Sequence, residues 1–296
     1  MVLVTNYAIS ILKYAEKYND YIYTPYVSEK FFYRQMRKIF GNKNLRYIEE
    51  KIYNQKLCGI KDCIIVFDSN ITKSFLKWLK RNNEEARIIF WYWNPVGKSI
   101  NPFEIPSGIE IWSYSRSDCE KYNLRFNTQF YFEELILEKE ESDYDVFFAG
   151  VDKGRRKMLL DYQSTFTKLN ITYKMEIVST LWYLKWLHKD YVASKPYKTI
   201  LSETNRSLAI LDLYVNRKAG NSLRVMESIF LGKKLITNNT EISKESFYSP
   251  EYIFVLGRRN IKELKSFLEK PVITDFSQIR KYYTYPKWKE RFKDAL

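Results

Sequence analysis

The 296-residue sequence contains a single histidine, His188, and three cysteines at scattered positions, Cys58, Cys63 and Cys119. One histidine argues against most histidine-based metal sites and catalytic triads. The odd number and the spacing of the cysteines argue against a disulfide framework or a zinc knuckle. Reduced thiols in a cytosolic protein are therefore the expected state.

Long hydrophobic runs are also lacking. The longest, such as Cys63–Phe67 and Ile88–Trp93, are far shorter than the ~20 residues that a helix needs to cross a membrane. The start of the chain, Met1–Tyr7, lacks the basic region and the apolar stretch of a signal peptide. We therefore expect a cytoplasmic protein, with peripheral attachment at the inner face of the membrane as one option. Glycine and proline number 9 and 8, so regular structure should dominate.

The chain is strongly basic and rich in aromatic residues. Lysine and arginine number 49 against 35 acidic residues, which gives a formal net charge of +14. This balance favours anionic partners, namely nucleic acid, an anionic membrane face or a phosphate-bearing ligand. A generally basic surface explains the charge equally well. Some of the 25 tyrosines, 19 phenylalanines and 7 tryptophans must reach the surface, where tyrosine and tryptophan suit half-wet sites.

Short apolar runs alternate with helical patterns along most of the chain. This alternation predicts parallel sheets covered by helices. An acidic stretch, Glu133–Asp145, interrupts the pattern, and we interpret its later part as a domain boundary. The fold class is therefore α/β, with two Rossmann-like domains facing across a cleft, where ligands of open α/β sheets bind. Strands are expected at Cys63–Phe67, Arg87–Trp93, Glu110–Tyr114, Val146–Ala149, Tyr173–Val178, Leu208–Tyr214, Leu235–Thr237 and Ile253–Leu256. Helices are expected at Ile71–Asn82, Cys119–Tyr122 (capped by Ser117 or Asp118), Arg155–Leu169, Leu181–Lys189, Tyr197–Asn205, Ser222–Leu231 and Ile261–Leu268.

The segment Asp212–Asn238 carries most of the functional argument. A buried strand runs into a basic, glycine-containing loop that ends at Asn221 or Ser222, either of which can cap the following helix. Gly232 ends that helix, and the next strand follows at once. The first turn of the helix should present free backbone N–H groups and a partial positive charge, which suit a phosphate. Gly220 would let a ligand approach the backbone closely.

Arg224 and Glu227 are three residues apart and should share the exposed face of this helix. A cation and an acid one turn from a phosphate-binding end suit a nucleotide diphosphate. The arginine would neutralise phosphate, and the carboxylate would accept both ribose hydroxyls. The alternative is an intrahelical ion pair on a surface helix.

The segment Ser207–Asn239 resembles the nucleotide-binding signature of glycosyltransferases with the two-domain GT-B fold. More narrowly, the chain is similar to CgeB-like and lipopolysaccharide or capsule biosynthesis glycosyltransferases. The residues that match are Ser222, Leu223, Arg224, Glu227 and Gly232–Asn238, and the stretches Ile88–Pro95, Trp112–Phe132 and Tyr144–Gly150 also look similar.

The resemblance implies a two-domain transferase that acts without a metal or other cofactor. Residues 1–140 would form an acceptor-binding domain and residues 141–275 a nucleotide-sugar-binding domain. Residues 276–296 would form a helical segment that packs back on the first domain. The enzyme would move a sugar from a nucleotide-sugar to a surface-polysaccharide or lipid-linked acceptor. Glu227 would contact the ribose, and Gly220, Asn221, Ser222, Leu223 and Arg224 would hold the pyrophosphate. The loop Arg217–Asn221 is more basic than this group leads us to expect, which leaves its phosphate contacts open.

A second phosphate element is expected at Gly150–Arg156, with Gly150, Lys153 and Arg155 as its binding residues. Two glycines and three cations at a strand-to-helix turn suit an anion. The spacing of a Walker loop is absent. The alternative is a solvated basic turn.

The acceptor should bind the N-terminal half. The stretch Ser28–Phe40 predicts a basic amphipathic helix suited to a phosphorylated acceptor or an anionic membrane. An ordinary surface helix is the alternative. The cations that would make this contact are Lys30, Arg34, Arg37 and Lys38.

An inverting transferase needs a base for the acceptor hydroxyl. Asp68, at the end of a predicted strand, is the first candidate, and Asp118 is the second. Either can instead be a cap or turn residue, and a retaining mechanism would need no such base.

Three other functions remain open. Asp143-Tyr144-Asp145 is a DxD triplet, the signature of metal-dependent transferases, although here it precedes a strand. A basic nucleic-acid-binding protein is the second, but no RRM, zinc-finger or KH signature is present, so we expect no nucleic-acid partner. The third is a catalytically inert protein that binds a sugar nucleotide, which only a transfer assay excludes.

Overall fold

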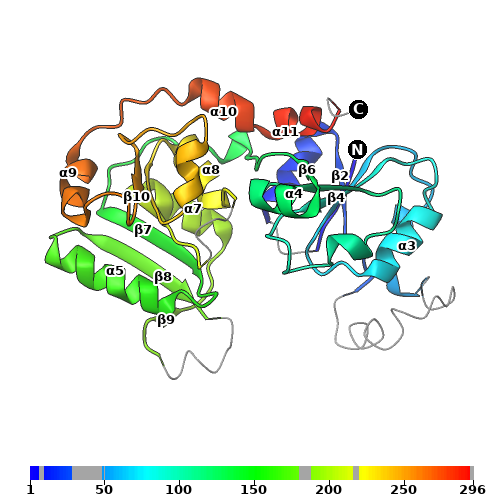
Figure 1. The fold of residues 1–296 in the computed structure, drawn as a ribbon, viewed down its shortest axis with the longest axis horizontal. Coiled ribbons are helices and arrows are strands. Elements are labelled where there is room, and N and C mark those ends of the chain that lie inside the picture. Colours follow the sequence, from blue (N-terminus) through cyan, green and yellow to red (C-terminus); the bar gives the residue numbers. More distant parts are fainter. Residues whose placement is uncertain (7–9, 29–48, 50, 180–187, 216–219, 294–296) are drawn as a thin grey trace. The chain divides into compact units, whose positions relative to one another are not determined.

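Figure 1 shows the computed structural model of the chain, which describes residues 1–6, 10–28, 49, 51–179, 188–215 and 220–293. The chain divides into two compact units, Met1–Thr128 and Gln129–Leu296, called unit 1 and unit 2 below. Within the described residues, each unit contains one six-stranded sheet. The predicted fold class of two Rossmann-like α/β domains is thus confirmed.

Unit 1 is built on a parallel sheet. Its strand order is β2-β1-β3-β4-β5-β6, and every neighbouring pair is parallel. The described elements are β1 (Val2–Val4), the 3₁₀ helix η1 (Ser10–Tyr18), β2 (Tyr21–Tyr23), η2 (Gln55–Leu57), β3 (Ile64–Phe67), α3 (Lys73–Arg81), β4 (Ile88–Tyr92), η3 (Pro102–Glu104), β5 (Glu110–Ser113), α4 (Arg116–Tyr122) and β6 (Arg125–Phe126).

The central strands β3 and β4 are buried on both faces, because they are continuous apolar runs without alternation. Such runs are typical of parallel strands with helices on both sides. The side chain of Thr72 accepts the N–H of Phe75 at 3.2 Å and so begins α3. Ser115 caps α4, so the predicted cap at Ser117 or Asp118 is wrong by two or three residues.

Unit 2 has the same type of sheet, in the order β12-β11-β10-β7-β8-β9, again with every neighbouring pair parallel. The described elements are η4 (Glu133–Leu135), β7 (Tyr144–Val151), α5 (Arg156–Lys168), β8 (Tyr173–Val178), β9 (Tyr191–Val192), α7 (Tyr197–Asn205), β10 (Ser207–Asp212), α8 (Leu223–Leu231), β11 (Lys234–Thr237), η5 (Thr240–Lys244), β12 (Ile253–Val255), η6 (Ile261–Glu263), α9 (Leu264–Glu269), α10 (Ser277–Tyr283) and α11 (Tyr285–Arg291).

The strand order of unit 2 reverses direction at β7. From β7 the chain continues outward to β8 and β9, then returns to the other side of β7 as β10 and continues to β11 and β12. Because parallel crossovers are right-handed, α5 covers one face of this sheet while α7 and α8 cover the other (Figure 1). The carboxyl ends of β7 and β10 therefore flank a topological switch point, where open α/β sheets bind ligands.

Residues after Thr128 belong to unit 2 because they pack on the C-terminal helices. Tyr131 donates its N–H to the carbonyl of Tyr283 and accepts the N–H of Tyr285, both at 2.9 Å. The ring of Phe130 lies 4.2 Å from the ring of Trp288, centroid to centroid. The unit limit at 128 thus differs from the predicted domain limit at 140.

The C-terminal segment is helical, as expected. Its α10 packs on α8, where the Nε of Arg280 donates to the carbonyl of Ile229 at 2.9 Å. The packing of residues 276–296 against the first domain stays a prediction.

Nearly all of the predicted basic helix 28–40 lies outside the described residues, with Lys30, Arg34, Arg37 and Lys38. The predicted helix Leu181–Lys189 is also largely outside them. Among the helices that the structure does describe, none has the length and the apolar composition needed to span a bilayer.

Candidate functional site

The junction between β10 and α8 forms as the sequence predicts. Of the two candidate caps, Ser222 takes the role: its hydroxyl accepts the N–H of Arg224 at 3.1 Å. Gly232 ends the helix with φ 64°, a left-handed conformation that glycine adopts without strain. Gly220 and Asn221 precede the cap, and the rest of the predicted loop, residues 216–219, lies outside the described residues.

The start of α8 is tied to the end of β10 by side chains. The Ser222 hydroxyl donates to the carboxylate of Asp212 at 3.0 Å, and the Ser222 N–H donates to the Tyr214 hydroxyl at 2.9 Å. The sequence led us to expect free N–H groups at the start of the helix, but not all of them are free. The N–H groups of Ser222 and Arg224 already have partners within the chain.

Arg224 turns toward the sheet rather than toward solvent. Its side chain is 19% exposed, and its Nη1 lies 3.6 Å from the Asp212 carboxylate. Its Nη2 donates to the carbonyl of Ala149, near the end of β7. The alternative reading, an intrahelical ion pair with Glu227, is wrong, because the acidic partner of Arg224 is Asp212 at the end of β10.

Glu227 is buried, not exposed as its helical position suggested. The residue is 6% exposed, and its Oε1 accepts the hydroxyl of Tyr197 at 2.9 Å. Burial raises the pKa of Glu227 to about 7, although Arg224 and the Tyr197 hydrogen bond both act to lower it. A carboxyl group with this pKa changes its charge near neutral pH.

Arg155 joins Arg224 at the carboxyl ends of β7 and β10. It donates to the carbonyl of Leu213 at 2.6 Å and to that of Val151 at 2.9 Å. The guanidinium carbons of both arginines lie 4.9 Å from the centroid of the Phe148 ring. Burial and the neighbouring Arg224 lower the pKa of Arg155 to about 10. Two like charges are thus held close together at the switch point.

Gly150 makes room for this arginine pair. A Cβ at this position would lie 2.2 Å from Nη2 of Arg224 and 3.2 Å from Nη2 of Arg155. The sequence analysis placed Gly150 among the binding residues of an anion-binding turn. In the structure, the space beside Gly150 is taken by two guanidinium groups of the protein itself.

The turn at 152–156 differs from the predicted anion site. The Asp152 carboxylate accepts the N–H of Arg156 at 2.6 Å, which places a negative charge at the start of α5. The same carboxylate accepts the hydroxyl of Tyr191 at 2.7 Å. Lys153 is exposed with φ 49°. Of the three residues predicted for this element, Gly150 and Arg155 contribute to the site, and Lys153 lies on the acid-capped turn.

Sequence reasoning missed three residues that organise the site, namely Asp212, Tyr214 and Asn238. The side-chain amide of Asn238 accepts the N–H of Tyr214 and donates to its carbonyl, both at 2.8 Å. Asp212 is the last residue of β10, and Asn238 directly follows β11. For Asp212 and Asn238 a signal was available but not used: each is a polar residue at the carboxyl end of one of two adjacent parallel strands.

The two candidate bases of unit 1 hold one turn after β4. Asp68 is 1% exposed, and its carboxylate accepts the N–H groups of Trp93 and Asn94 at 3.2 and 3.3 Å, and the Asn94 amide at 3.2 Å. Burial raises the pKa of Asp68 to about 6. The Asp118 carboxylate accepts the N–H of Val96 at 3.0 Å. Both contacts match the turn-residue alternative.

The DxD triplet lies at the other end of β7. Asp143 pairs with Arg206, and the Asp145 carboxylate accepts the N–H of Thr172 at 2.8 Å. Both residues stand at the amino end of the strand, whereas Gly150 stands near its carboxyl end. Ligands of open α/β sheets bind beyond the carboxyl ends, so this position does not favour a donor site at the triplet.

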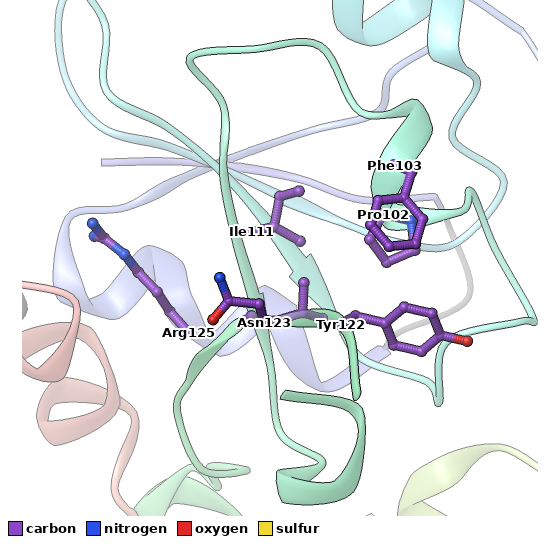
Figure 2. Close-up of a pocket in the computed structure, with 7 residues that line it drawn as sticks. Pro102, Phe103, Ile111, Tyr122, Asn123 and Arg125 are labelled. Atoms are coloured by element: carbon purple, nitrogen blue, oxygen red, sulfur yellow. The ribbon is translucent and has the colours of Figure 1, made fainter. Parts of the chain in front are cut away.

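Unit 1 has an open pocket with a volume of about 290 Å³. Figure 2 shows residues that line it. The rings of Phe103 and Tyr122 lie toward one end of it, and Arg125, which is paired with Glu110 at 2.8 Å, lies toward the other. The pocket is at the amino ends of β5 and β6, and no predicted site residue lines it. Its lining consists of Pro102, Phe103, Ile111, Tyr122, Asn123, Leu124 and Arg125.

The fold is similar to that of solved structures, although no protein-family model and no curated protein matches the sequence. Anabaena Alr3699/HepE, solved in complex with UDP and glucose, is 10% identical with a TM-score of 0.55, over 99% of this chain and 90% of that chain. This likeness shows the fold, two Rossmann-like domains of the GT-B type.

Two further structures give lower scores. One is the catalytic domain of starch synthase IV from Arabidopsis thaliana bound to ADP and acarbose (TM-score 0.46, 11% identity, 78% of this chain and 72% of that chain). The other is a UDP-N-acetylglucosamine 2-epimerase, so described provisionally, from Listeria monocytogenes (TM-score 0.45, 9% identity, 99% and 94%).

Replacing Asp68 tests whether its carboxylate holds the turn at 93–96. Asp68→Ala leaves three donors without their acceptor and should lower the free energy of unfolding by about 2–4 kcal/mol. Asp68→Asn keeps one acceptor oxygen and should lose less. Urea denaturation measures both, with Asp118→Ala, which removes one acceptor, as the matched comparison. Unchanged stability in Asp68→Ala would contradict the structural role.

Proposed function

We propose that this chain is a glycosyltransferase that binds a nucleotide-sugar at the carboxyl ends of β7 and β10. The observation that carries the proposal is the arrangement of charges there. Two arginines, Arg155 and Arg224, stand side by side, and a buried carboxylate, Glu227, lies one turn further along α8. An anion between them would relieve the repulsion of the arginine pair, and a diphosphate carries that charge.

The arginines suit the leaving group of a glycosyl transfer. In the reaction, the bond between the anomeric carbon and the diphosphate oxygen breaks, and its electron pair stays on that oxygen. A new bond forms to the acceptor oxygen, whose proton passes to a base. Preorganised cations at the leaving oxygen stabilise the charge that develops there. Arg224, which is part-exposed, would contact phosphate, and Arg155, which is mostly buried, would orient the two strand ends.

The helix start can contribute after one local exchange. The N–H of Ser222 is bonded to the Tyr214 hydroxyl in this structure. A phosphate oxygen that takes this N–H would replace the hydroxyl, which a tyrosine side chain allows by a small rotation. The helix dipole would then act on the phosphate together with Arg224.

Glu227 suits the ribose. Its ionised carboxylate accepts two hydrogen bonds from adjacent hydroxyls, as acids do at the ribose of dinucleotides. Its Oε1 is held by Tyr197, which fixes the plane of the carboxylate. Because its pKa is about 7, nucleotide binding should strengthen as the pH rises through neutrality and Glu227 ionises.

The finer points rest on the resemblance to CgeB-like and lipopolysaccharide-biosynthesis enzymes. On that basis the acceptor is a surface polysaccharide or its lipid-linked precursor, and the reaction takes place at the cytoplasmic face of the membrane. The fold that the chain shares with the Anabaena protein, solved with UDP and glucose, supports a nucleotide-sugar as donor. Acceptor contact by Lys30, Arg34, Arg37 and Lys38, and catalysis by Asp68 or Asp118, stay predictions.

A thermal-shift screen against UDP-, GDP-, TDP- and CMP-sugars tests the donor. One class should raise the melting temperature, on the order of a few degrees at saturation, because it binds only the folded chain. Glu227→Ala should abolish the shift, since it removes the ribose contact. Glu263→Ala, an exposed acid of the same unit, is the matched control and should retain the shift. If no nucleotide-sugar shifts the wild-type protein, the proposed donor site is wrong.

Gly150→Ala should weaken nucleotide-sugar affinity about tenfold or more, measured by titration calorimetry. The added methyl group would clash with Nη2 of Arg224 and should displace this side chain from Asp212 and Ala149. In an Arg224→Ala background, the same change should have little further effect, because its target is gone. Two fully additive effects would mean that Gly150 acts in some other way.

The proposed reaction does not use a metal. Release of nucleotide diphosphate from the sugar donor should continue unchanged in excess EDTA. A variant with both Asp143→Asn and Asp145→Asn should also keep the activity, because these side chains lie at the amino end of β7. Loss of activity that Mg²⁺ or Mn²⁺ restores would instead support the DxD triplet as a metal site.

A further inference from the structure

A chain of hydrogen bonds connects Glu227 through Tyr197 to Tyr131, near the start of unit 2. The Tyr197 hydroxyl donates to Oε1 of Glu227 at 2.9 Å, and the hydroxyls of Tyr197 and Tyr131 are 2.7 Å apart. The three residues come from α8, from the start of α7 and from the segment just after the unit limit at 128. Two side chains thus link elements far apart in sequence to one carboxylate: Tyr197 directly, and Tyr131 through Tyr197.

The direction of this chain follows from counting protons. A tyrosine hydroxyl carries one proton and accepts through its oxygen. The Tyr197 hydroxyl uses its only hydrogen in the bond that it donates to Glu227. In the hydrogen bond between the two tyrosines, Tyr131 must therefore be the donor and Tyr197 the acceptor. The donated bonds therefore all point toward the carboxylate and favour its ionised form.

The far end of the chain is firmly anchored. Tyr131 is fully buried, and its backbone bonds to Tyr283 and Tyr285 on either side of Thr284. Its ring lies 4.9 Å from the ring of Phe230 on α8. Tyr131 therefore cannot follow Tyr197 if that side chain moves, and it fixes the position of the Tyr197 hydroxyl.

The charged groups around Glu227 come from its own helix and from one strand. Arg224 on α8 lowers the pKa of Glu227, and Asp212 at the end of β10 raises it. The Tyr197 hydrogen bond from α7 lowers it as well. Burial also raises the pKa of Tyr197 itself well above its ordinary value, so its hydroxyl keeps its proton throughout the neutral range.

The geometry points to Tyr197, braced by Tyr131, as a positioning residue that orients the Glu227 carboxylate for the ribose of the donor. This inference rests on the proposed function, because it assigns a task within the same nucleotide site. It adds two residues that lie outside the β10–α8 motif and that no phosphate or ribose contact requires. Tyr197 acts on the nucleotide through Glu227, and Tyr131 acts through Tyr197.

Tyr197→Phe tests this role through the pH dependence of binding. In the wild type, affinity for a nucleotide-sugar should rise as the pH passes through about 7, because Glu227 ionises there and the donor keeps a constant charge. Removing the Tyr197 donor takes away a hydrogen bond that lowers the pKa of Glu227. The rise should therefore move to higher pH, and affinity at pH 7 should fall by about three- to tenfold. Titration calorimetry at a series of pH values measures both.

A double-mutant cycle separates this role from general loosening of the fold. Glu227→Gln removes the titrating group, so Tyr197→Phe should cost little further affinity in that background. Tyr131→Phe should shift the pH profile in the same direction as Tyr197→Phe, by a smaller amount. Tyr144→Phe is the matched control, because it removes a part-buried tyrosine hydroxyl that bonds the carbonyl of Glu203, away from the site. It should leave the pH profile in place.

The outcomes distinguish the inference from the function on which it rests. If the wild type binds no nucleotide-sugar, the proposed function itself is wrong. If Glu227→Gln weakens binding while Tyr197→Phe leaves the pH profile unchanged, the function stands and the positioning role is overturned. Additive losses in the Glu227→Gln and Tyr197→Phe cycle would likewise overturn it, because Tyr197 would then act independently of the carboxylate.

Discussion

Two guanidinium groups held against one phenylalanine ring determine the arrangement at the carboxyl ends of β7 and β10. Arg155 and Arg224 repel each other, and the buried Asp212 carboxylate partly offsets that repulsion. Gly150 leaves room for both guanidiniums, because a Cβ at this position would lie too close to each of them. The pair thus stays in place through carbonyl acceptors and ring contacts while its charge remains incompletely balanced, which is a favourable starting state for binding an anion.

Local sequence patterns predicted the elements of this site better than its contacts. The cap at Ser222, the helix over α8 and the turn at Gly232 depend on a few adjacent residues, so the motif was sufficient. The partner of Arg224 is Asp212 at the end of β10. No local pattern specifies that this arginine turns back toward the strand. Glu227 occupies a helical position that looks exposed, yet the residue is buried and its carboxylate is bonded to Tyr197 at the start of α7. Burial of this kind depends on tertiary packing and cannot be read from helical spacing.

Unit 1 shows the same division between pattern and packing. The continuous apolar runs of β3 and β4 predicted buried parallel strands, which the structure has. The strands β1 and β2 have three residues each, too few for any period to appear in the sequence. Asp68 was recognised as a strand-end acid, but its three donors come from a turn some 25 residues later in the chain. The sequence located the residue without showing what it holds.

The two backbone hydrogen bonds between Tyr131 and residues 283–285 limit where a fragment of this protein can begin and end. Consider a fragment that is designed to carry the nucleotide site by itself. If it begins in the acidic stretch near residue 141, it lacks Tyr131 and both of these hydrogen bonds. If it ends before α10, it lacks Tyr283 and Tyr285, together with the contact of Arg280 to α8. Neither the segment around Tyr131 nor the C-terminal helices contribute an atom to the β10–α8 motif. The smallest fragment that folds by itself should nevertheless include both. It should start at Gln129 and run through α11.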